Sequence, residues 1–312
     1  MRDVAVVIPT LRRPESLERA IRSVLAQEDV GDRLREIVVA DNDPQASARP
    51  LVDALAGSST PLVWVHAPRP GVATARNMGL SATEAPLIAF LDDDESASPG
   101  WLAALLKAQA STGADVVFGP IKGRAPNATG WTTAYLERFF GREGPVSDQL
   151  IDEPFGCGNS LMVRASALPG PAPFDASADQ AGGEDDALFA ALAARGGRFG
   201  WAAEAWVEEF APPHRATLRY ALQRAFAYGQ GPSQTAAARR DWPSVLRWMM
   251  IGAAQAAVFG AASLLLTLVF HSKRAELYDR TARGIGKVLW MKGLEPHFYG
   301  ARELARLQRA AA

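Results

Sequence analysis

Short apolar segments alternate with amphipathic segments over the first 120 residues of this 312-residue chain. The apolar segments are rich in Val, Ile, Leu and Phe and end at Pro, Gly or Asp, as buried strands do. The intervening segments place apolar residues three or four positions apart, as Leu17, Ile21 and Val24 show after Pro14, and predict helices. The alternation indicates an α/β sheet with right-handed crossovers. The strands predicted in this way cover residues 4–8, 37–40, 62–65, 87–91 and 116–119.

Polar residues follow several of these strands directly. Pro9 and Thr10 end the first strand, residues 41–43 end the second, and the four acidic residues 92–95 end the fourth. In open α/β sheets ligands bind beyond the carboxyl ends of the strands, so these clusters are expected to form one site. Adjacent carboxylates repel one another and suit Mg²⁺ or Mn²⁺ shared with a substrate's phosphates. The alternative for residues 92–95 is a solvated loop with acidic helix-capping residues.

A second acidic cluster, Glu184, Asp185 and Asp186, follows Gly182 and Gly183 and heads a predicted helix over residues 187–195. Asp and Glu also cap helices well, so capping is the alternative interpretation. Considered with residues 92–95, the second cluster offers a general base beside a metal site. That combination is sufficient for metal-assisted group transfer.

Composition excludes some classes of protein. The net charge is −1, which does not favour a nucleic-acid-binding protein. The chain has one cysteine, Cys157, so no internal disulfide is possible and a reducing compartment is expected. The first residues run straight into a strand and lack the apolar segment of a signal peptide.

Residues 248–270 carry no charged side chain and are long enough to cross a bilayer as a helix. Basic residues flank this segment on both sides, so the positive-inside rule gives no clean orientation. A re-entrant hairpin or a helix in the membrane plane explains two basic flanks better than a single crossing. The alternative is a helix buried in a soluble core.

Several motifs together resemble a family 2 glycosyltransferase of the GT-A fold, of the bacterial membrane-associated type. They occur in the family's order over about the first 215 residues, and each is weak alone. The resemblance implies a Rossmann-like mixed sheet flanked by helices, a catalytic domain over residues 1–225, and a membrane-associated helical region over residues 226–312. The matching segments read VAVVIPTLRRPESLERAIRSVLAQ, EIVVADNDP, RPGVATARNMGLSAT, LIAFLDDDE, FGCGNSLMVR and GGEDDALFAAL.

The resemblance implies a set of residues that bind the nucleotide-sugar donor. Those at the ends of the first two strands would hold the nucleotide, with Asp41 towards the base or ribose. Arg76 would lie near the phosphates, and Asn159, with Gly158, would shape the sugar and acceptor pocket. A solvated helix charge is the alternative for Arg76. The implied donor-binding residues are Pro9, Thr10, Asp41, Asn42, Arg76, Asp92, Asp93 and Asn159.

The family's D-x-D motif corresponds to Asp92 and Asp94, and Asp94 is the metal ligand expected from the resemblance. Many metal-dependent relatives have a His beyond the base, and His214 or Glu208 would take that place here. A plain loop residue is the alternative for His214. Asp185, with Glu184 beside it, matches the family's E-D pair and is the expected base, with Asp186 as its rival.

The implied reaction is inverting transfer of a sugar from a nucleoside-diphosphate sugar, with UDP favoured, to a hydroxyl of a glycan or lipid-linked acceptor. Mn²⁺ or Mg²⁺ would assist this transfer. The expected setting is cell-surface polysaccharide synthesis at the cytoplasmic face of the membrane, anchored through the C-terminal region. Two alternatives are a nucleotidyltransferase acting on sugar phosphates, whose phosphate loop PTLRRPES matches poorly, and a non-catalytic membrane scaffold.

Overall fold

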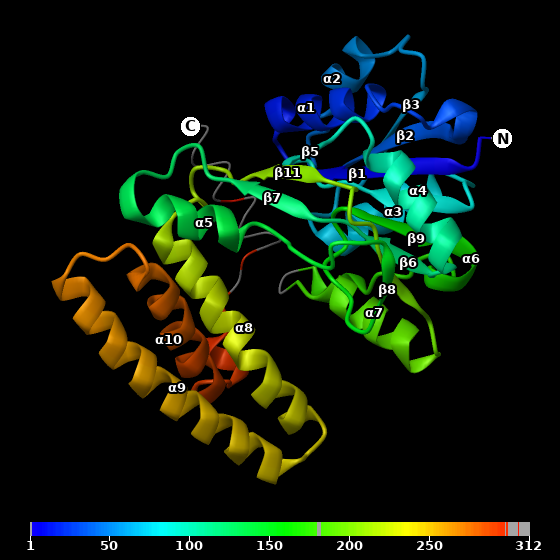
Figure 1. Ribbon diagram of the computed structural model, residues 1–312. Helices are drawn as coiled ribbons and strands as arrows, with labels where there is room; N and C mark the ends of the chain where they lie inside the picture. The colour runs from blue at the N-terminus through cyan, green and yellow to red at the C-terminus, as the bar shows by residue number, and fades with distance from the viewer. Residues whose placement is uncertain (1, 180–181, 297, 299–304, 306–312) are drawn as a thin grey trace. The chain divides into compact units, whose positions relative to one another are not determined.

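The structure is a computed structural model that describes residues 2–179, 182–296, 298 and 305 (Figure 1). The chain divides into two compact units. Unit 1 comprises residues 1–122, 142–209 and 297–312, and unit 2 comprises residues 123–141 and 210–296. The predicted boundary at residue 225 falls inside helix α8 (Leu218–Ala238), and the assignment of functions to 1–225 and 226–312 stays a prediction.

Unit 1 is built on an eight-stranded mixed sheet with the order β3-β2-β1-β4-β9-β6-β10-β8. Strands β3, β2, β1 and β4 run parallel, whereas β9 is antiparallel to both β4 and β6. A smaller sheet has the order β5-β11-β7. The strands of the larger sheet are β1 (Val4–Thr10), β2 (Leu34–Asp41), β3 (Leu62–His66), β4 (Leu87–Phe90), β6 (Val116–Phe118), β8 (Gln149–Ile151), β9 (Ser160–Val163) and β10 (Phe199–Trp201), and those of the smaller are β5 (Glu95–Ala97), β7 (Ile121–Arg124) and β11 (Val207–Phe210).

Helices cover both faces of the larger sheet, which is why its central strands are apolar throughout. Alternate residues of β1 enter two separate cores, Val4, Val6 and Ile8 on one face and Ala5 and Val7 on the other. Helices α1 (Pro14–Leu25), α2 (Arg49–Ala54) and α4 (Trp101–Thr112) pack on the first face; α3 (Val72–Ser81), α6 (Arg164–Ala167) and α7 (Glu184–Ala194) pack on the second. Short 3₁₀ turns cover Gly31–Arg33, Gly130–Thr132, Ala176–Ala178 and Lys292–Leu294.

The five strands and the helices predicted from periodicity are confirmed, and the structure also contains strands β5, β7, β8, β9, β10 and β11, which were not predicted. Glu95 does not belong to a loop but begins β5. Helix α7 begins at Glu184, so the second acidic cluster forms its first turn rather than preceding it. Strand β9 was not expected, because its residues Ser160–Val163 lie within a segment whose glycines and polar residues obscure the short apolar run.

Unit 2 contains α5 (Thr133–Phe139) and three long helices, α8, α9 (Trp242–Leu268) and α10 (Arg274–Val288). In Figure 1 these three long helices lie side by side, and α10 contacts both α8 and α9. The predicted apolar segment 248–270 lies in α9 and the two residues after it. Helix α9 is long and apolar enough to cross a membrane, and little of it is buried within the protein, which does not support the buried-core alternative.

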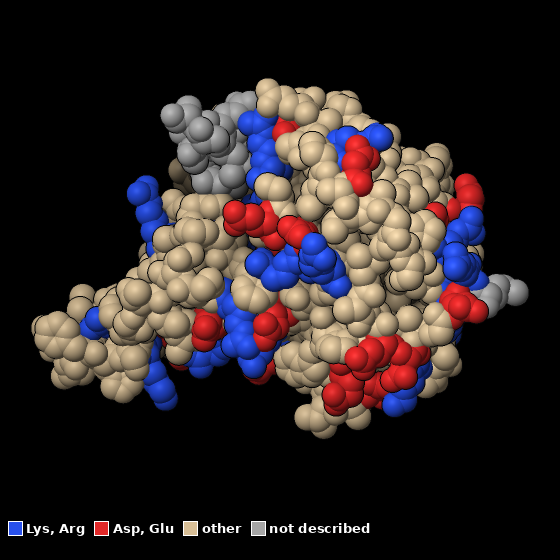
Figure 2. All heavy atoms as spheres, turned by 90° about the horizontal axis from the view of Figure 1, so that it is seen from above, with Lys and Arg blue, Asp and Glu red and all other residues tan. Residues whose placement is uncertain are grey.

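Figure 2 shows Lys and Arg side chains beside Asp and Glu side chains over one face, in keeping with the net charge of −1.

Candidate active site

The turn between β4 and β5 presents three consecutive aspartates beside the end of β1. The Thr10 hydroxyl, at the end of β1, donates a 2.8 Å hydrogen bond to Asp93. Arg13, just before α1, places one guanidinium nitrogen 2.8 Å from Asp93 and 2.9 Å from Asp94. The ends of β1 and β4 therefore meet, as the strand-end argument expects, and a guanidinium holds two of the carboxylates.

Arg76 of α3 joins the two acidic clusters. Its guanidinium forms an ion pair with Glu184 in the first turn of α7 and lies 3.5 Å from Asp92 on the other side. The Arg76 side chain is only 5% exposed and stacks 5.6 Å from the ring of Phe174. Burial alone would lower its pKa, but the surrounding acidic groups outweigh burial and raise the pKa of Arg76. Its charge is therefore fixed, and the alternative of a solvated helix charge is wrong.

The loop at residues 156–158 touches a carboxylate from each cluster. The Cys157 backbone N–H donates a 3.0 Å hydrogen bond to Asp185 Oδ2, and Asp185 Oδ1 accepts one from the N–H of Asp186. A Cβ at Gly158 would lie 2.5 Å from Asp92 Oδ2, closer than real Cβ atoms come. A glycine is thus needed for Asp92 to reach this loop. Asp185 is partly exposed, whereas Asp186 is exposed.

The electrostatics of the site are dominated by buried negative charge. Desolvation raises the pKa of Asp92, Asp93 and Glu184, although Arg76 and Arg13 pull these values back down. Glu95 is buried and receives a backbone N–H from Asp92, yet desolvation and the neighbouring acids raise its pKa well above the usual range. The six acidic residues Asp92, Asp93, Asp94, Glu95, Glu184 and Asp185 are termed the carboxylate cluster. Arg13 pairs with Asp93 and Asp94, Arg76 pairs with Asp92 and Glu184, and the charge of Arg142 lowers the pKa of Glu95.

Asp41 and Asn42 lie at the end of β2, and their side chains already form hydrogen bonds with other groups of the protein. The Asp41 carboxylate accepts hydrogen bonds from the N–H groups of Asp43 and Ala48 and from the indole of Trp64. The Asn42 amide donates to two carbonyl oxygens after β3 and accepts from the Gly71 N–H. Pro9 is buried within β1. These residues shape the strand ends, and their contact with a nucleotide stays a prediction.

Asn159 has a similar structural role. Its amide donates to the carbonyl oxygens of Pro120 and Ala205 and accepts from the Trp101 indole, and no part of it reaches solvent. Its φ of 52° lies in the left-handed region, which Asn tolerates better than most residues. These hydrogen bonds fix the loop that carries Gly158, and a role for Asn159 in a sugar and acceptor pocket stays a prediction.

His214 belongs to unit 2, and its role as a metal ligand stays a prediction. Within the described residues, no three His, Cys, Asp or Glu side chains are grouped as a ready metal site. The chemistry of the carboxylates nevertheless fits Mg²⁺ or Mn²⁺, since such ions are often held by one or two carboxylates together with substrate phosphates. Asp92 is 38% exposed and can reach such an ion, and the uncompensated negative charge around it favours one.

Two arginines were missed from sequence. Arg13 follows the first strand end by three residues in PTLRR, and its position beside Thr10 is the signal that could have identified it. Arg142 donates to the carbonyl oxygen of Gly156 at 3.1 Å and stacks 5.3 Å from the ring of Phe155. Burial lowers its pKa, while the charges of Glu95, Glu209 and Asp92 oppose that shift. Nothing in the local sequence around Arg142 indicates this position.

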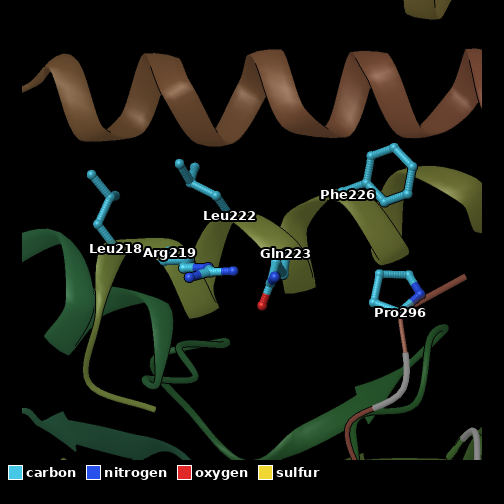
Figure 3. Close-up of a pocket in the computed structure, with 6 residues that line it drawn as sticks. All are labelled: Leu218, Arg219, Leu222, Gln223, Phe226 and Pro296. Atoms are coloured by element: carbon cyan, nitrogen blue, oxygen red, sulfur yellow. The ribbon is translucent and has the colours of Figure 1, made fainter. Parts of the chain in front are cut away.

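An apolar groove lies elsewhere, in unit 2, and Figure 3 shows its six lining residues. None of the predicted site residues is among them. The groove lies along α8 and is lined by Leu218, Arg219, Leu222, Gln223, Phe226 and Pro296.

Comparison with known proteins identifies the family. The sequence model of "Glycosyl transferase family 2" matches residues 5–169, a range that contains Arg76 and Asp92 but ends before Glu184. Over 96% of its length the chain is 32% identical to the succinoglycan biosynthesis protein ExoM of Rhizobium meliloti, covering 97% of that protein.

More distant relatives match only part of the chain. It is 38% identical to the pre-mycofactocin glycosyltransferase of Mycobacterium tuberculosis over 34% of the chain and 20% of that protein. It is 26% identical to the glycosyltransferase AglE of Haloferax volcanii over 40% of the chain and 41% of that protein. The chain therefore belongs to glycosyl transferase family 2, the enzymes that transfer sugars from nucleotide-sugar donors to glycan acceptors.

Proposed function

We propose that this enzyme transfers a sugar, with inversion, from a nucleoside-diphosphate sugar to a hydroxyl of a glycan or lipid-linked acceptor during cell-surface polysaccharide synthesis. UDP is the favoured nucleotide. The near full-length similarity to a succinoglycan biosynthesis protein supports the polysaccharide setting. Family membership disfavours both the nucleotidyltransferase and the non-catalytic scaffold.

The observation that carries this proposal is the pairing of two carboxylates across one short loop. Asp92 abuts Gly158, and Asp185 accepts the N–H of Cys157. Arg76 links the two segments that carry these carboxylates, since it pairs with Glu184 at the start of α7 and with Asp92 after β4. A metal-side carboxylate and a candidate base thus both lie next to residues 157–158.

The bond changes follow from these positions. Asp185 takes the proton of the acceptor hydroxyl, and the hydroxyl oxygen forms a bond to the anomeric carbon of the sugar. The bond from that carbon to the diphosphate oxygen breaks on the opposite side, which inverts the configuration. Asp92 and Asp94, with His214 proposed as a further ligand, would hold Mn²⁺ or Mg²⁺. When bound, the ion neutralises charge on the departing nucleoside diphosphate.

Arg76 and Arg13 support the reaction by position. Arg13 orients Asp93 and Asp94, and Arg76 keeps α3 and α7 at a fixed separation. A base positioned in this way typically contributes about 10²–10⁴ in rate. Glu184 is fully engaged with Arg76, so it supports its neighbour rather than acting as the base itself.

The experiment that tests the proposal measures release of nucleoside diphosphate from a panel of UDP-, GDP-, CDP- and dTDP-sugars, with Mn²⁺ and with EDTA. Turnover of one donor with Mn²⁺, lost with EDTA, is expected. Consumption of a nucleoside triphosphate with a sugar phosphate would instead indicate a nucleotidyltransferase. Tight donor binding without any turnover across the panel would indicate a scaffold.

We further propose that the enzyme works at the cytoplasmic face of the membrane, held there by the C-terminal helical region. The exposed apolar helix α9 supports this location. Fractionation of cells should place the full chain with the membranes, and deletion of residues 248–270 should release it from them. Retention on membranes of the chain without these residues would show that the anchor lies elsewhere.

A further inference from the structure

Helix α9 has two opposite sides of different character. The side that faces α10 contains every polar side chain of the helix after Arg247. Gln255 donates to the carbonyl oxygen of Arg280 at 2.7 Å, and Thr267 shares a hydrogen bond with the Tyr278 hydroxyl. Ser263 is buried and bonds within its own helix. No uncharged polar group of this part of α9 is left on the outer side.

After Arg247 the outer side of α9 is a continuous apolar stripe, which covers about 140° of the circumference of the helix at 100° per residue. Leu264 is 68% exposed and Leu268 is 76% exposed, values unusual for leucine in a protein surrounded by water. The apolar stripe begins after Arg247 and consists of Met250, Ala253, Ala254, Ala257, Val258, Ala261, Leu264, Leu265 and Leu268, all of them exposed.

Helix α10 runs along the inner side of α9 at close range. A Cβ at Gly284 would lie 2.7 Å from the backbone nitrogen of Ala256, and one at Gly252 would lie 2.6 Å from the carbonyl oxygen of Gly284. The contacts extend from Tyr278 beside Thr267 to Lys287, whose ammonium donates to Gln255. Helix α10 therefore packs along the central part of α9, and moving it away would break these contacts.

Helix α10 is highly charged over the same length. Arg280 is exposed and its guanidinium lies 5.0 Å from the ring of Phe259 in the middle of α9. Arg283 pairs with Asp279 at 2.6 Å, and Lys287 lies one turn farther on. If α9 crossed a bilayer, these charges would sit at the depth of the lipid tails, where ionised side chains are strongly disfavoured.

The charge of this region matches an anionic surface. Residues 239–296 contain nine Lys and Arg and four Asp and Glu, a net charge of +5 in a chain whose total is −1. Arg239, Arg240 and Lys273 are exposed next to the two ends of α9. Anionic headgroups attract basic residues placed beside an inserted apolar face.

We infer that α9 lies in the plane of one anionic lipid leaflet, with the apolar stripe among the acyl chains and α10 on the water side, and does not cross the bilayer. This inference rests on the membrane location proposed above and adds how the enzyme is held there. Both ends of α9 then lie on the same side of the membrane, as the two basic flanks require.

Labelling from each side of the membrane tests the topology of the full chain. Arg239→Cys and Ser272→Cys each place one thiol beside an end of α9, and wild type is the blank because Cys157 is buried. An impermeant maleimide is applied to inverted and to right-side-out membrane vesicles. Both thiols should react from the same side. Reaction from opposite sides would establish a crossing helix and overturn the inference.

Depth measurements separate an in-plane helix from a re-entrant hairpin. A fluorophore is attached to Met250→Cys or to Leu265→Cys, about 20 Å apart along the helix at 1.5 Å per residue. Lipids with a nitroxide near the headgroup should quench both fluorophores equally. A stepwise increase in depth from one position to the other would overturn the in-plane arrangement.

A matched pair of substitutions tests the apolar stripe itself. Leu265→Glu should weaken binding to phosphatidylglycerol-containing vesicles roughly tenfold or more, the loss expected for one buried leucine. Val146→Glu adds the same charge at a side chain that is 97% exposed in unit 1, and it should leave binding unchanged. Unchanged vesicle binding by Leu265→Glu, with loss of a lipid-free dimer, would show that a second copy covers the stripe.

Release of nucleoside diphosphate is measured in parallel and separates the two proposals. In-plane binding without any donor turnover would remove the proposed reaction and leave the membrane arrangement standing. Donor turnover by a protein whose α9 crosses the bilayer would remove the membrane arrangement and leave the proposed reaction standing.

Discussion

Arg76→Met removes the guanidinium that joins the two acidic clusters while keeping a side chain of similar length. Glu184 is almost fully buried and would lose its ion-pair partner. Breaking a buried ion pair by removing one partner costs about 3–5 kcal/mol, because the other charge stays buried without compensation. Asp92 also loses its neighbour, but it is partly exposed and water screens much of that loss.

This cost corresponds to a measurable change in thermal stability. A destabilisation of 1 kcal/mol lowers the melting temperature of a domain this size by about 2–4 °C, so Arg76→Met should lower it by roughly 6–20 °C. Differential scanning fluorimetry of the purified protein measures this change. The matched control is Arg22→Met, whose pair with Glu18 is exposed on α1 and should be worth about 0.5 kcal/mol.

The double variant Arg76→Met/Glu184→Gln distinguishes an ion pair from a general packing role. If the cost of Arg76→Met comes from the stranded charge of Glu184, neutralising Glu184 should restore part of the lost stability. We expect about 1–3 kcal/mol of coupling between the two positions, the range found for residues in contact. Strict additivity of the two single changes, or an Arg76→Met cost no larger than that of Arg22→Met, would refute the proposed bridge.

Three other predictions address the same site. Asp185→Asn should lower turnover by about 10²–10⁴ with nucleotide binding near normal, and Asp186→Asn should change it only a few-fold; initial rates and nucleotide titration decide which is the base. Gly158→Ala should raise KM for the donor and Mn²⁺, because the new methyl group would displace Asp92; an unchanged KM would contradict that geometry. Desolvation raises the pKa of Glu95 in the folded protein. Above about pH 4.3 the unfolded chain releases this proton while the folded protein still holds it, so the free energy of unfolding falls as pH rises. Glu95→Gln should flatten this decline in melting temperature of the metal-free protein, and a steeper decline would contradict it.

The fold of unit 1 was largely predictable because its central strands are buried on both faces. Such strands read as continuous apolar runs, as residues 4–8 do, and their helices follow at regular intervals. Strand β9 escaped notice because an antiparallel strand inserted between β4 and β6 has no local sequence marker. Its partners lie about 45 and 75 residues earlier in the chain, and only tertiary structure brings them together.

The candidate site was predictable in its residue types but not in its hydrogen bonds. Acidic residues at a strand end are visible in sequence, whereas the partners of Asn159 are three groups 39 to 58 residues away. A polar side chain at the end of a strand can either contact a ligand or hold a loop in place by hydrogen bonds. The side chains of Asp41 and Asn42 hold neighbouring backbone groups by hydrogen bonds, and their contact with a nucleotide stays a prediction.

The imbalance of charge in the carboxylate cluster links its structure to its chemistry. Burial of these carboxylates, together with the charges of neighbouring acids, raises the pKa of Asp92, Asp93, Glu95 and Glu184. A nucleoside diphosphate brings further negative charge and would be repelled by this cluster on its own. A divalent cation supplies the missing positive charge for both, so donor and cation are expected to bind together. From the grouping of these carboxylates we therefore predict that the donor binds more weakly when Mn²⁺ and Mg²⁺ are removed.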